Sequence, residues 1–221
     1  MLIAAASLAP FAASAEDSAR ATGVYVRGGG GVVFGEALNQ DLAYHPSIAA
    51  PAPLADGKDT DLGEGLSLSA AIGFQYGKTR TELEYRRMTP SIDAVAYTGG
   101  TPIAPGPAVN DDFEVQALMS NIYFDLVNKS RLTPYIGFGV GGARVENELG
   151  ERDAVFAYQG RAGVDVALSR KLSVGAEYVY FRTLDFRYGP EEFDPATPGG
   201  ARTDGDPLVS SSVMGNLRLV F

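Results

Sequence analysis

The chain has 221 residues, of which 27 are glycine, one is histidine and none is cysteine, and its formal net charge is −9. This length suits a single all-β domain. The missing cysteines exclude disulfides and thiolate metal sites, and the lone histidine excludes a multi-histidine zinc site. The acidic balance disfavours nucleic acid as a partner. We therefore expect no metal site, no cofactor and no nucleic-acid ligand.

Residues 1–15 are apolar and small, and they end in Ala13-Ser14-Ala15 just before two acidic residues. An A-x-A triplet after an apolar stretch is typical of a secretory signal peptide. The alternative is a short N-terminal helix. We predict a signal peptide at 1–15 and one domain at 16–221. No later apolar run is long enough for a spanning helix, so the domain can cross a membrane only as a closed barrel.

The first predicted strand covers residues 22–35, with Val24 and Val32 on one face and Arg27 on the other. The run Gly28–Gly31 weakens this strand, which indicates a bend or crowding by large neighbours inside a barrel. A phosphate-binding loop is excluded because neither a helix pattern nor a Lys-Ser/Thr pair follows.

Residues 36–62 form a predicted long loop rich in proline, alanine and aspartate. The clearest alternation of apolar and small polar residues follows at 63–76 and predicts the second strand. A two-residue turn at Gly77-Lys78 leads to a third strand at 79–88, which has charged residues on one face. Residues 89–111 form the second predicted long loop.

The fourth predicted strand, residues 112–126, has apolar residues on both faces. Leu118 and Ile122 favour one face, whereas Val115 and Met119 favour the other. A β-bulge in this strand would reconcile its two halves.

The fifth predicted strand begins at Leu132 and places Ile136 and Phe138 opposite alternate glycines. The segments that follow are an acidic loop at 146–153, a strand at 154–168, a turn at 169–171, a strand at 172–186 and a third long loop at 187–207.

The last predicted strand covers 208–221 and has Leu217 and Phe221 on one face, with Asn216 and Arg218 on the other. Such alternation indicates a strand between two different surroundings. Its aromatic final residue resembles the closing strand of outer-membrane β-barrels. In that family the terminal phenylalanine is part of the signal for the insertion machinery, which is the role expected for Phe221. The alternative is an edge strand of a soluble sheet.

These segments make eight strands whose connections alternate between short turns and longer loops, as in transmembrane β-barrels. A soluble barrel would have an apolar interior and a polar exterior. Here one face of most strands is apolar, with tyrosines near the strand ends, and the charged residues lie on the opposite face. Its four acids and four bases balance, as buried charges require. The predicted interior salt-bridge residues are Arg27, Glu82, Glu84, Arg86, Arg161, Asp165, Glu177 and Arg218.

Two stretches carry a family resemblance: N-I-Y-F-D at 121–125 and L-T-P-Y-I-G-F-G-V-G-G at 132–142. They resemble the small outer-membrane β-barrel family that includes opacity proteins, surface antigens and barrels like that of outer membrane protein A. The resemblance covers residues 22–221. It implies an all-β, eight-stranded antiparallel up-and-down transmembrane barrel in the bacterial outer membrane, with exposed loops that are sometimes used for adhesion.

Three patterns suggest other functions. Gly137-x-Gly139-x-x-Gly142 matches a dinucleotide-binding motif, but strand alternation continues through it and no helix follows, so we interpret these glycines as space for opposed side chains. The interior carboxylates are an alternative catalytic set, although the narrow interior of an eight-stranded barrel favours structural ion pairs. His45 and Ser47 lie in a loop with no triad geometry, and we interpret His45 as solvated or packed within the loop.

We predict no catalytic residue and no enzyme activity. The predicted function is a surface protein for envelope integrity or loop-mediated adhesion, with a narrow porin-like solute channel and a lipid-modifying enzyme as alternatives. The expected partners are outer-membrane lipids, lipopolysaccharide, the outer-membrane insertion machinery, and host surface or matrix proteins that contact the loops. The loops are rich in acids, which indicates a solvated surface, weak divalent-cation bridging or a basic partner.

Overall fold

The computed structural model describes residues 22–48, 54–99, 113–126, 130–146, 152–190, 192–196 and 199–221. The predicted signal peptide at residues 1–15 lies outside these ranges, so it stays a prediction. Within them, no helix is long and apolar enough to cross a membrane. The described segments form one antiparallel sheet of eleven strands.

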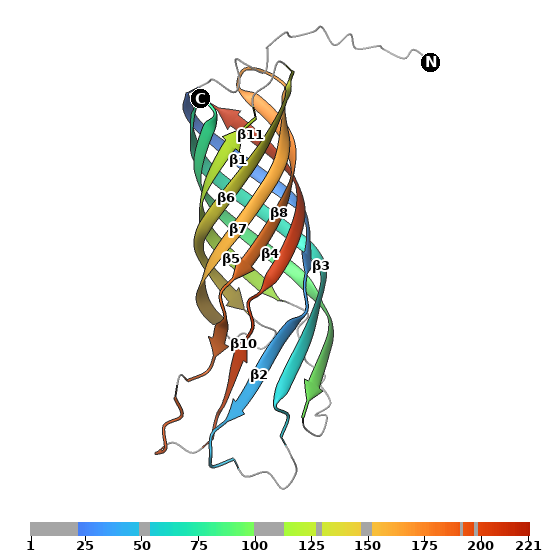
Figure 1. Cartoon of the computed structure of the whole chain (residues 1–221), viewed down its shortest axis with the longest axis vertical. Helices are drawn as coiled ribbons and strands as arrows, with labels where there is room; N and C mark the ends of the chain where they lie inside the picture. Colours follow the sequence, from blue (N-terminus) through green and yellow to red (C-terminus); the bar gives the residue numbers. More distant parts are fainter. Residues whose placement is uncertain are drawn as a thin grey trace, which may run out of the picture.

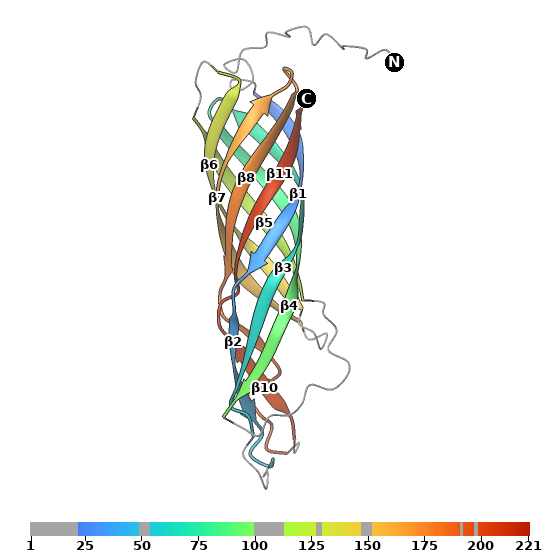
Figure 2. The same ribbon diagram turned by 90° about the vertical axis from the view of Figure 1, so that its right-hand side faces the viewer.

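Eight of these strands close into a barrel, seen from two sides in Figures 1 and 2. They are β1 (Gly23–Gly35), β3 (Gly57–Tyr76), β4 (Thr79–Thr98), β5 (Glu114–Asp125), β6 (Leu132–Glu146), β7 (Arg152–Ala167), β8 (Leu172–Thr183) and β11 (Val209–Val220). Strand β1 pairs with both β3 and β11, which closes the ring. A closed ring leaves no unpaired backbone edge, so strands can cross a bilayer in this form. The predicted eight-stranded antiparallel barrel is confirmed.

Side chains along the barrel strands alternate between the interior and the outer wall. In β11, Asn216 and Arg218 are buried, whereas Leu217 and Leu219 are exposed on the outer wall. The outer wall carries large apolar side chains on every barrel strand, as a bilayer requires. Both ends of the barrel sequence lie at one rim, because β1 and β11 are antiparallel neighbours there. Phe221 is exposed at this rim, and its role in insertion stays a prediction.

The bulge expected in the fourth strand is absent, because β5 pairs with both neighbours without a register shift. Val115 and Met119 point inward and are buried, whereas Leu118 and Ile122 point outward. Both faces of β5 are apolar around Leu118, because this part of the barrel interior is itself apolar. The register shifts occur in β3, on either side of Leu62.

Three shorter strands lie beyond the barrel, at the end away from the termini (Figures 1 and 2). They are β2 (Leu38–Tyr44), β9 (Phe186–Tyr188) and β10 (Ala201–Gly205). Strand β10 pairs with β2 and β9, and β2 pairs with the beginning of β3. The beginning of β3 pairs in turn with the end of β4. These segments form an extension of the sheet, which we call the extension.

The prediction of three long loops is therefore partly wrong. Residues 36–62 contain β2 and the beginning of β3, residues 89–111 contain the end of β4, and residues 187–207 contain part of β9 and all of β10. The predicted acidic loop at 146–153 is also shorter, because Glu146 pairs with Arg152 in the sheet. Beyond the membrane a sheet has no lipid-facing side, so the apolar alternation used to recognise strands is lost there.

Candidate functional site

The interior of the barrel nearest the termini holds a layer of charged and amide side chains. The carboxylate of Asp165 lies 3.2 Å from both Arg80 Nη1 and Arg218 Nη2. Arg80 Nη2 lies 2.8 Å from Asp125 Oδ1, and Arg218 Nη1 donates a hydrogen bond of 2.6 Å to Gln75. Each charge in this layer has an oppositely charged neighbour, which is the condition for burying it.

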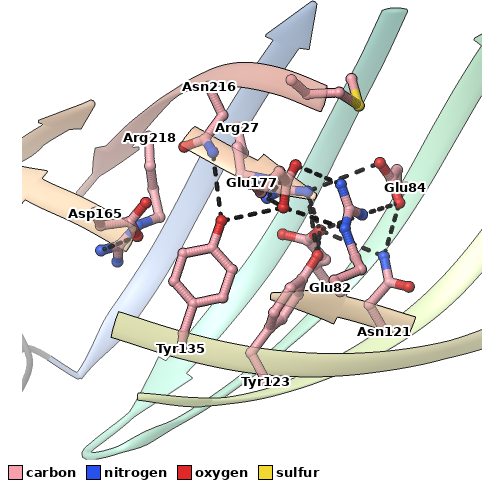
Figure 3. A network of polar contacts seen from close by, with 12 residues as sticks. Arg27, Glu82, Glu84, Asn121, Tyr123, Tyr135, Asp165, Glu177, Asn216 and Arg218 are labelled. Carbon is pink, nitrogen blue, oxygen red and sulfur yellow. Dashed lines mark hydrogen bonds and ion pairs between the residues drawn. The ribbon is translucent and has the colours of Figure 1, made fainter. Parts of the chain in front are cut away.

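The next layer is built around Arg27, which projects from β1 across the barrel (Figure 3). Its guanidinium lies 3.0 Å from Glu82 Oε1 and 3.1 Å from Glu177 Oε2. The hydroxyl of Tyr123 accepts a hydrogen bond from Arg27 and donates one of 2.6 Å to Glu82. These residues come from four strands, so the network ties opposite walls of the barrel together.

Arg161 joins the same network from β7. It forms an ion pair with Glu84 and a second one of 2.6 Å between Nη2 and Glu177 Oε1. Glu84 also accepts hydrogen bonds of 2.9 Å from Asn121 and Gln159. A buried carboxylate with two amide donors and a guanidinium partner is held as a charge without contact with water.

Arg86 lies at the edge of the polar network and has neutral partners. It donates hydrogen bonds to Ser67, Gln159 and Ser212, at 3.2, 3.3 and 2.6 Å. Within the described residues it has no carboxylate at ion-pairing distance. The methionine sulfur of Met214 meets Ser67 at this level, and the interior becomes apolar beyond it.

Three interior tyrosines each lie over a glycine of the neighbouring strand. In each pair the two residues are directly opposite in register, and a Cβ on the glycine would overlap the tyrosine ring. The pairs are Tyr25 with Gly73, Tyr123 with Gly137 and Tyr135 with Gly163. An aromatic ring over a strand glycine covers its bare backbone. The glycines therefore create the space in which the aromatic and arginine side chains pack.

The half of the interior nearest the extension is a hydrophobic core. Its buried side chains come from barrel strands and from the extension together, and β9 contributes two aromatic rings. The core consists of Val33, Leu38, Leu62, Met88, Phe113, Val115, Ala117, Met119, Ala143, Val145, Ala157, Phe181, Phe186, Tyr188 and Leu208. None of these residues is more than 6% exposed, so their side chains pack closely together.

All eight charged residues singled out from the sequence lie inside the barrel, and none is more than 4% exposed. Sequence reasoning missed Arg80 and Asp125, which belong to the same networks. Their position in the alternation was the available signal, since Arg80 shares a face with Glu82 and Asp125 shares one with Asn121.

His45 packs within the extension, next to the end of β2. Its ring is buried, edge-on to Phe193, and Nδ1 lies 2.6 Å from Ser47 Oγ. Its Nε2 lies 3.2 Å from the carbonyl oxygen of Asp194. Ser47 Oγ also accepts a hydrogen bond of 3.0 Å from the Gly199 amide. The histidine and serine thus join the β2 segment to the segment before β10.

An acidic hollow of about 420 Å³ lies where β2, β9 and β10 meet. Asp41, Asp185 and Asp206 line it and are exposed. Asp204 is clamped between Arg187 and Arg202, at 2.5 and 2.8 Å. Partial burial would raise the pKa of Asp204, but hydrogen bonds from the two arginines outweigh this and lower it below the usual range.

The described acidic residues do not form a group of three or more that converges on a metal position, and neither do the described histidine and acids together. The arrangement of side chains therefore consists of a filled interior and an acidic surface on the extension. A barrel with an apolar outer wall, closed by hydrogen bonds, is a transmembrane protein of the outer-membrane class.

Comparison with known proteins agrees with this class. A family model described as "Outer membrane protein beta-barrel domain" matches residues 2–199. The chain belongs to this family, which places it in the bacterial outer membrane. No curated protein matches the sequence closely enough to be called a relative.

Two solved structures share the fold. The outer membrane protein OprG from Pseudomonas aeruginosa has a TM-score of 0.57 and 14% sequence identity, over 91% of this chain and 98% of that one. Neisserial surface protein A has a TM-score of 0.52 and 15% identity, over 90% of this chain and 97% of that one. At these identities the similarity concerns the fold alone.

Proposed function

We propose that this protein is a non-enzymatic surface protein that acts through its extracellular extension, by binding a basic partner. The observation that carries the proposal is the filled interior. Charged networks occupy one half of the barrel and a hydrophobic core occupies the other, so the extension is the part left to contact other molecules.

A solute channel is disfavoured by the same packing. An eight-stranded barrel has an interior just wide enough for its own side chains. Here the interior is closed twice, by the ion pairs of Arg27 and Arg161 and by the aromatic rings of the hydrophobic core. A conducting path would require both layers to move apart.

An enzyme is disfavoured by the surroundings of His45 and Ser47. A nucleophilic serine needs a free hydroxyl, a base and a group that orients the base. Ser47 is two residues from His45, so their contact is of the kind found in local turns. The Ser47 hydroxyl also accepts a hydrogen bond from the Gly199 amide. The orienting contact of His45 is the backbone carbonyl of Asp194, and the described residues place no carboxylate there.

The acidic surface of the extension indicates the chemistry of the partner. Asp41, Asp185 and Asp206 are exposed around one hollow, with no ion pair to the described part of the chain. Like charges on a surface raise the association rate of an oppositely charged partner and make it dependent on salt. A protein surface rich in lysine and arginine meets this description.

Binding to poly-lysine beads tests the proposal, with the purified barrel in liposomes and poly-glutamate beads as the negative surface. We expect binding to poly-lysine that weakens with salt. The triple variant Asp41→Asn, Asp185→Asn, Asp206→Asn should bind at least severalfold more weakly. The matched control, Glu36→Gln, Asp61→Asn, Glu64→Gln, makes the same change in charge at exposed residues outside the lining of the hollow and should bind like the wild type. Equal losses in both triple variants would contradict a site at the hollow.

Planar-bilayer recordings test the channel alternative on the same preparation. We expect no stable conductance. A large and stable conductance that the triple variants retain would replace our proposal with the channel function.

A further inference from the structure

A hollow of about 530 Å³ lies on the outer wall of the barrel, across β4, β5, β6 and β7. One row of directly paired residues runs through it, from Tyr85 to Leu118, Gly142 and Phe156. Three of these four residues are large and exposed, but Gly142 has no side chain. The hollow is therefore a gap in the apolar wall at Gly142, with Leu118 on one side and the Phe156 ring on the other.

The next row toward the extension is polar. It runs from Arg87 to Gln116, Arg144 and Ala154, again through direct pairs. Arg87 and Gln116 both donate hydrogen bonds of 2.5 Å to Glu114, so this carboxylate is already matched. Arg144 is exposed and forms no ion pair with the described residues. Its guanidinium thus lies at the upper edge of the apolar hollow.

The height of this arrangement in the membrane follows from strand geometry. Strand β6 presents apolar residues outward from Leu132 to Val140, followed by Gly142 and then Arg144. The steps from Leu132 to Gly142, at about 3.3 Å each on a strand tilted by about 40°, span about 25 Å. This is the height of the apolar band of an outer-membrane barrel. Arg144 therefore lies at the head-group level on the side of the extension, which faces outward.

We propose that this hollow binds lipopolysaccharide, with one acyl chain over Gly142 between Leu118 and Phe156 and one phosphate on Arg144. An acyl chain leaves the bilayer to enter the hollow, so its packing against Leu118 and the Phe156 ring contributes dispersion contacts. The selectivity comes from the arginine, which binds phosphate through paired, charge-assisted hydrogen bonds. The outer leaflet supplies a lipid that has both parts.

The position of Gly142 allows a direct test. A Cβ on Gly142 would meet no atom closer than 4.0 Å, so the variant Gly142→Leu fills the hollow without disturbing the barrel. Gly160 also faces the outer wall and has nothing within 4 Å, and it lies outside the hollow. Gly160→Leu is therefore the matched control. Arg144→Gln removes the phosphate contact, and Arg170→Gln is its control, at an exposed turn on the termini side.

The experiment uses the refolded full chain in detergent micelles and measures bound lipid by native mass spectrometry. The probe is lipid A with two phosphates, compared with dephosphorylated lipid A and with phosphatidylglycerol. Heat-modifiable gel mobility checks that every variant is folded. We expect lipid A to bind the wild type. Arg144→Gln should weaken binding by about tenfold or more, as loss of a charged hydrogen bond implies. Gly142→Leu should weaken it by a similar factor, because the leucine side chain occupies the space of the acyl chain. The two controls should bind like the wild type.

Three results would overturn the proposal. Equal binding by all variants would mean that lipid A covers the barrel without a site. Equal binding of phosphatidylglycerol or dephosphorylated lipid A would mean that the hollow does not select a phosphorylated glycolipid. The third result comes from chemical cross-linking of the same proteins. A cross-linked dimer that forms in the wild type and is lost in Gly142→Leu, while lipid A still binds the variant, would mean that a second copy of the chain occupies the hollow.

Discussion

The half of the barrel interior nearest the termini contains guanidinium, carboxylate, phenol and amide groups, whereas the half nearest the extension contains methionine, valine, leucine and aromatic side chains. Both halves are surrounded by the same apolar outer wall and by the same ring of backbone hydrogen bonds. Two different solutions to filling a barrel therefore follow one another along a single axis, with Arg86 and Met214 at the boundary.

The two halves differ in what determines their geometry. Ion pairs and hydrogen bonds in the polar half have preferred directions, and each acid must find its base. The apolar half depends on shape and volume alone. In the apolar half the inward face is apolar, and the outward face carries both apolar residues and polar ones such as Gln116 and Arg144. The alternation that identifies a barrel strand is therefore clear only in the polar half. Variants in each half sharpen this comparison.

The largest effect is expected for Arg161→Leu in the polar half. It leaves Glu84 and Glu177 without their main partner, and an uncompensated buried charge costs about 3–5 kcal/mol. Urea unfolding followed by heat-modifiable gel mobility measures it. Arg87→Leu, which breaks an exposed ion pair, should cost under about 1 kcal/mol. Equal costs would contradict the view that the network carries charge inside the barrel.

Met119→Ala tests the apolar half and is expected to cost about 2–5 kcal/mol, because Met119 is fully buried in the hydrophobic core and leaves a cavity. The same unfolding assay applies. Met119→Leu keeps the volume and should cost less than about 1.5 kcal/mol. A similar loss for both substitutions would argue against packing as the source of stability in this half.

Gly137→Ala tests the tyrosine–glycine pairs of the polar half. A Cβ at this position overlaps the Tyr123 ring, and overpacking costs about 1–3 kcal/mol. Because Tyr123 holds Glu82 and Arg27, the shift should also disturb the network. Gly160→Ala has open space and should leave the unfolding midpoint unchanged. If both variants have the same unfolding midpoint, packing of the Tyr123 ring does not depend on a glycine at position 137.

His45→Ala contrasts the barrel with the extension. It removes the contacts to Ser47 and Asp194, each worth about 1 kcal/mol. Hydrogen exchange should rise in residues 38–48 and leave the barrel strands unchanged, because the extension opens locally. Lower protection throughout the barrel would mean that extension and barrel unfold together.

The smallest effect is expected from pH, through Asp204. The pKa of Asp204 is lower in the folded extension than in the unfolded chain, so its ionised form stabilises the folded extension. This stabilisation is complete above the ordinary value of 3.8 and is lost as the pH falls through the lower pKa of the folded state. Limited proteolysis of the extension should therefore accelerate only in strong acid. Asp204→Asn should remove this dependence, and acceleration near neutral pH would point to another group.

The alternation of residues in the sequence determined the barrel, because a strand between lipid and a charged interior must change character at every residue. The last strand, from Val213 to Arg218, is an example. The same alternation placed the eight charged residues inside the barrel. Arg80 and Asp125 follow it too, since they lie on the inward faces of β4 and β5.

Only the tertiary structure decided which charges meet, since Arg27 and Glu177 are 150 residues apart and are brought together by ring closure. It also decided that Val115 and Met119 face inward without a bulge, because the interior at that level is itself apolar and apolar residues do not mark the outward face there. The strands of the extension were hidden in the sequence because their buried face mixes polar and apolar residues. Gln40 and Lys58 are buried on the same sheet as Leu38, so an alternation of apolar and polar residues does not mark these strands.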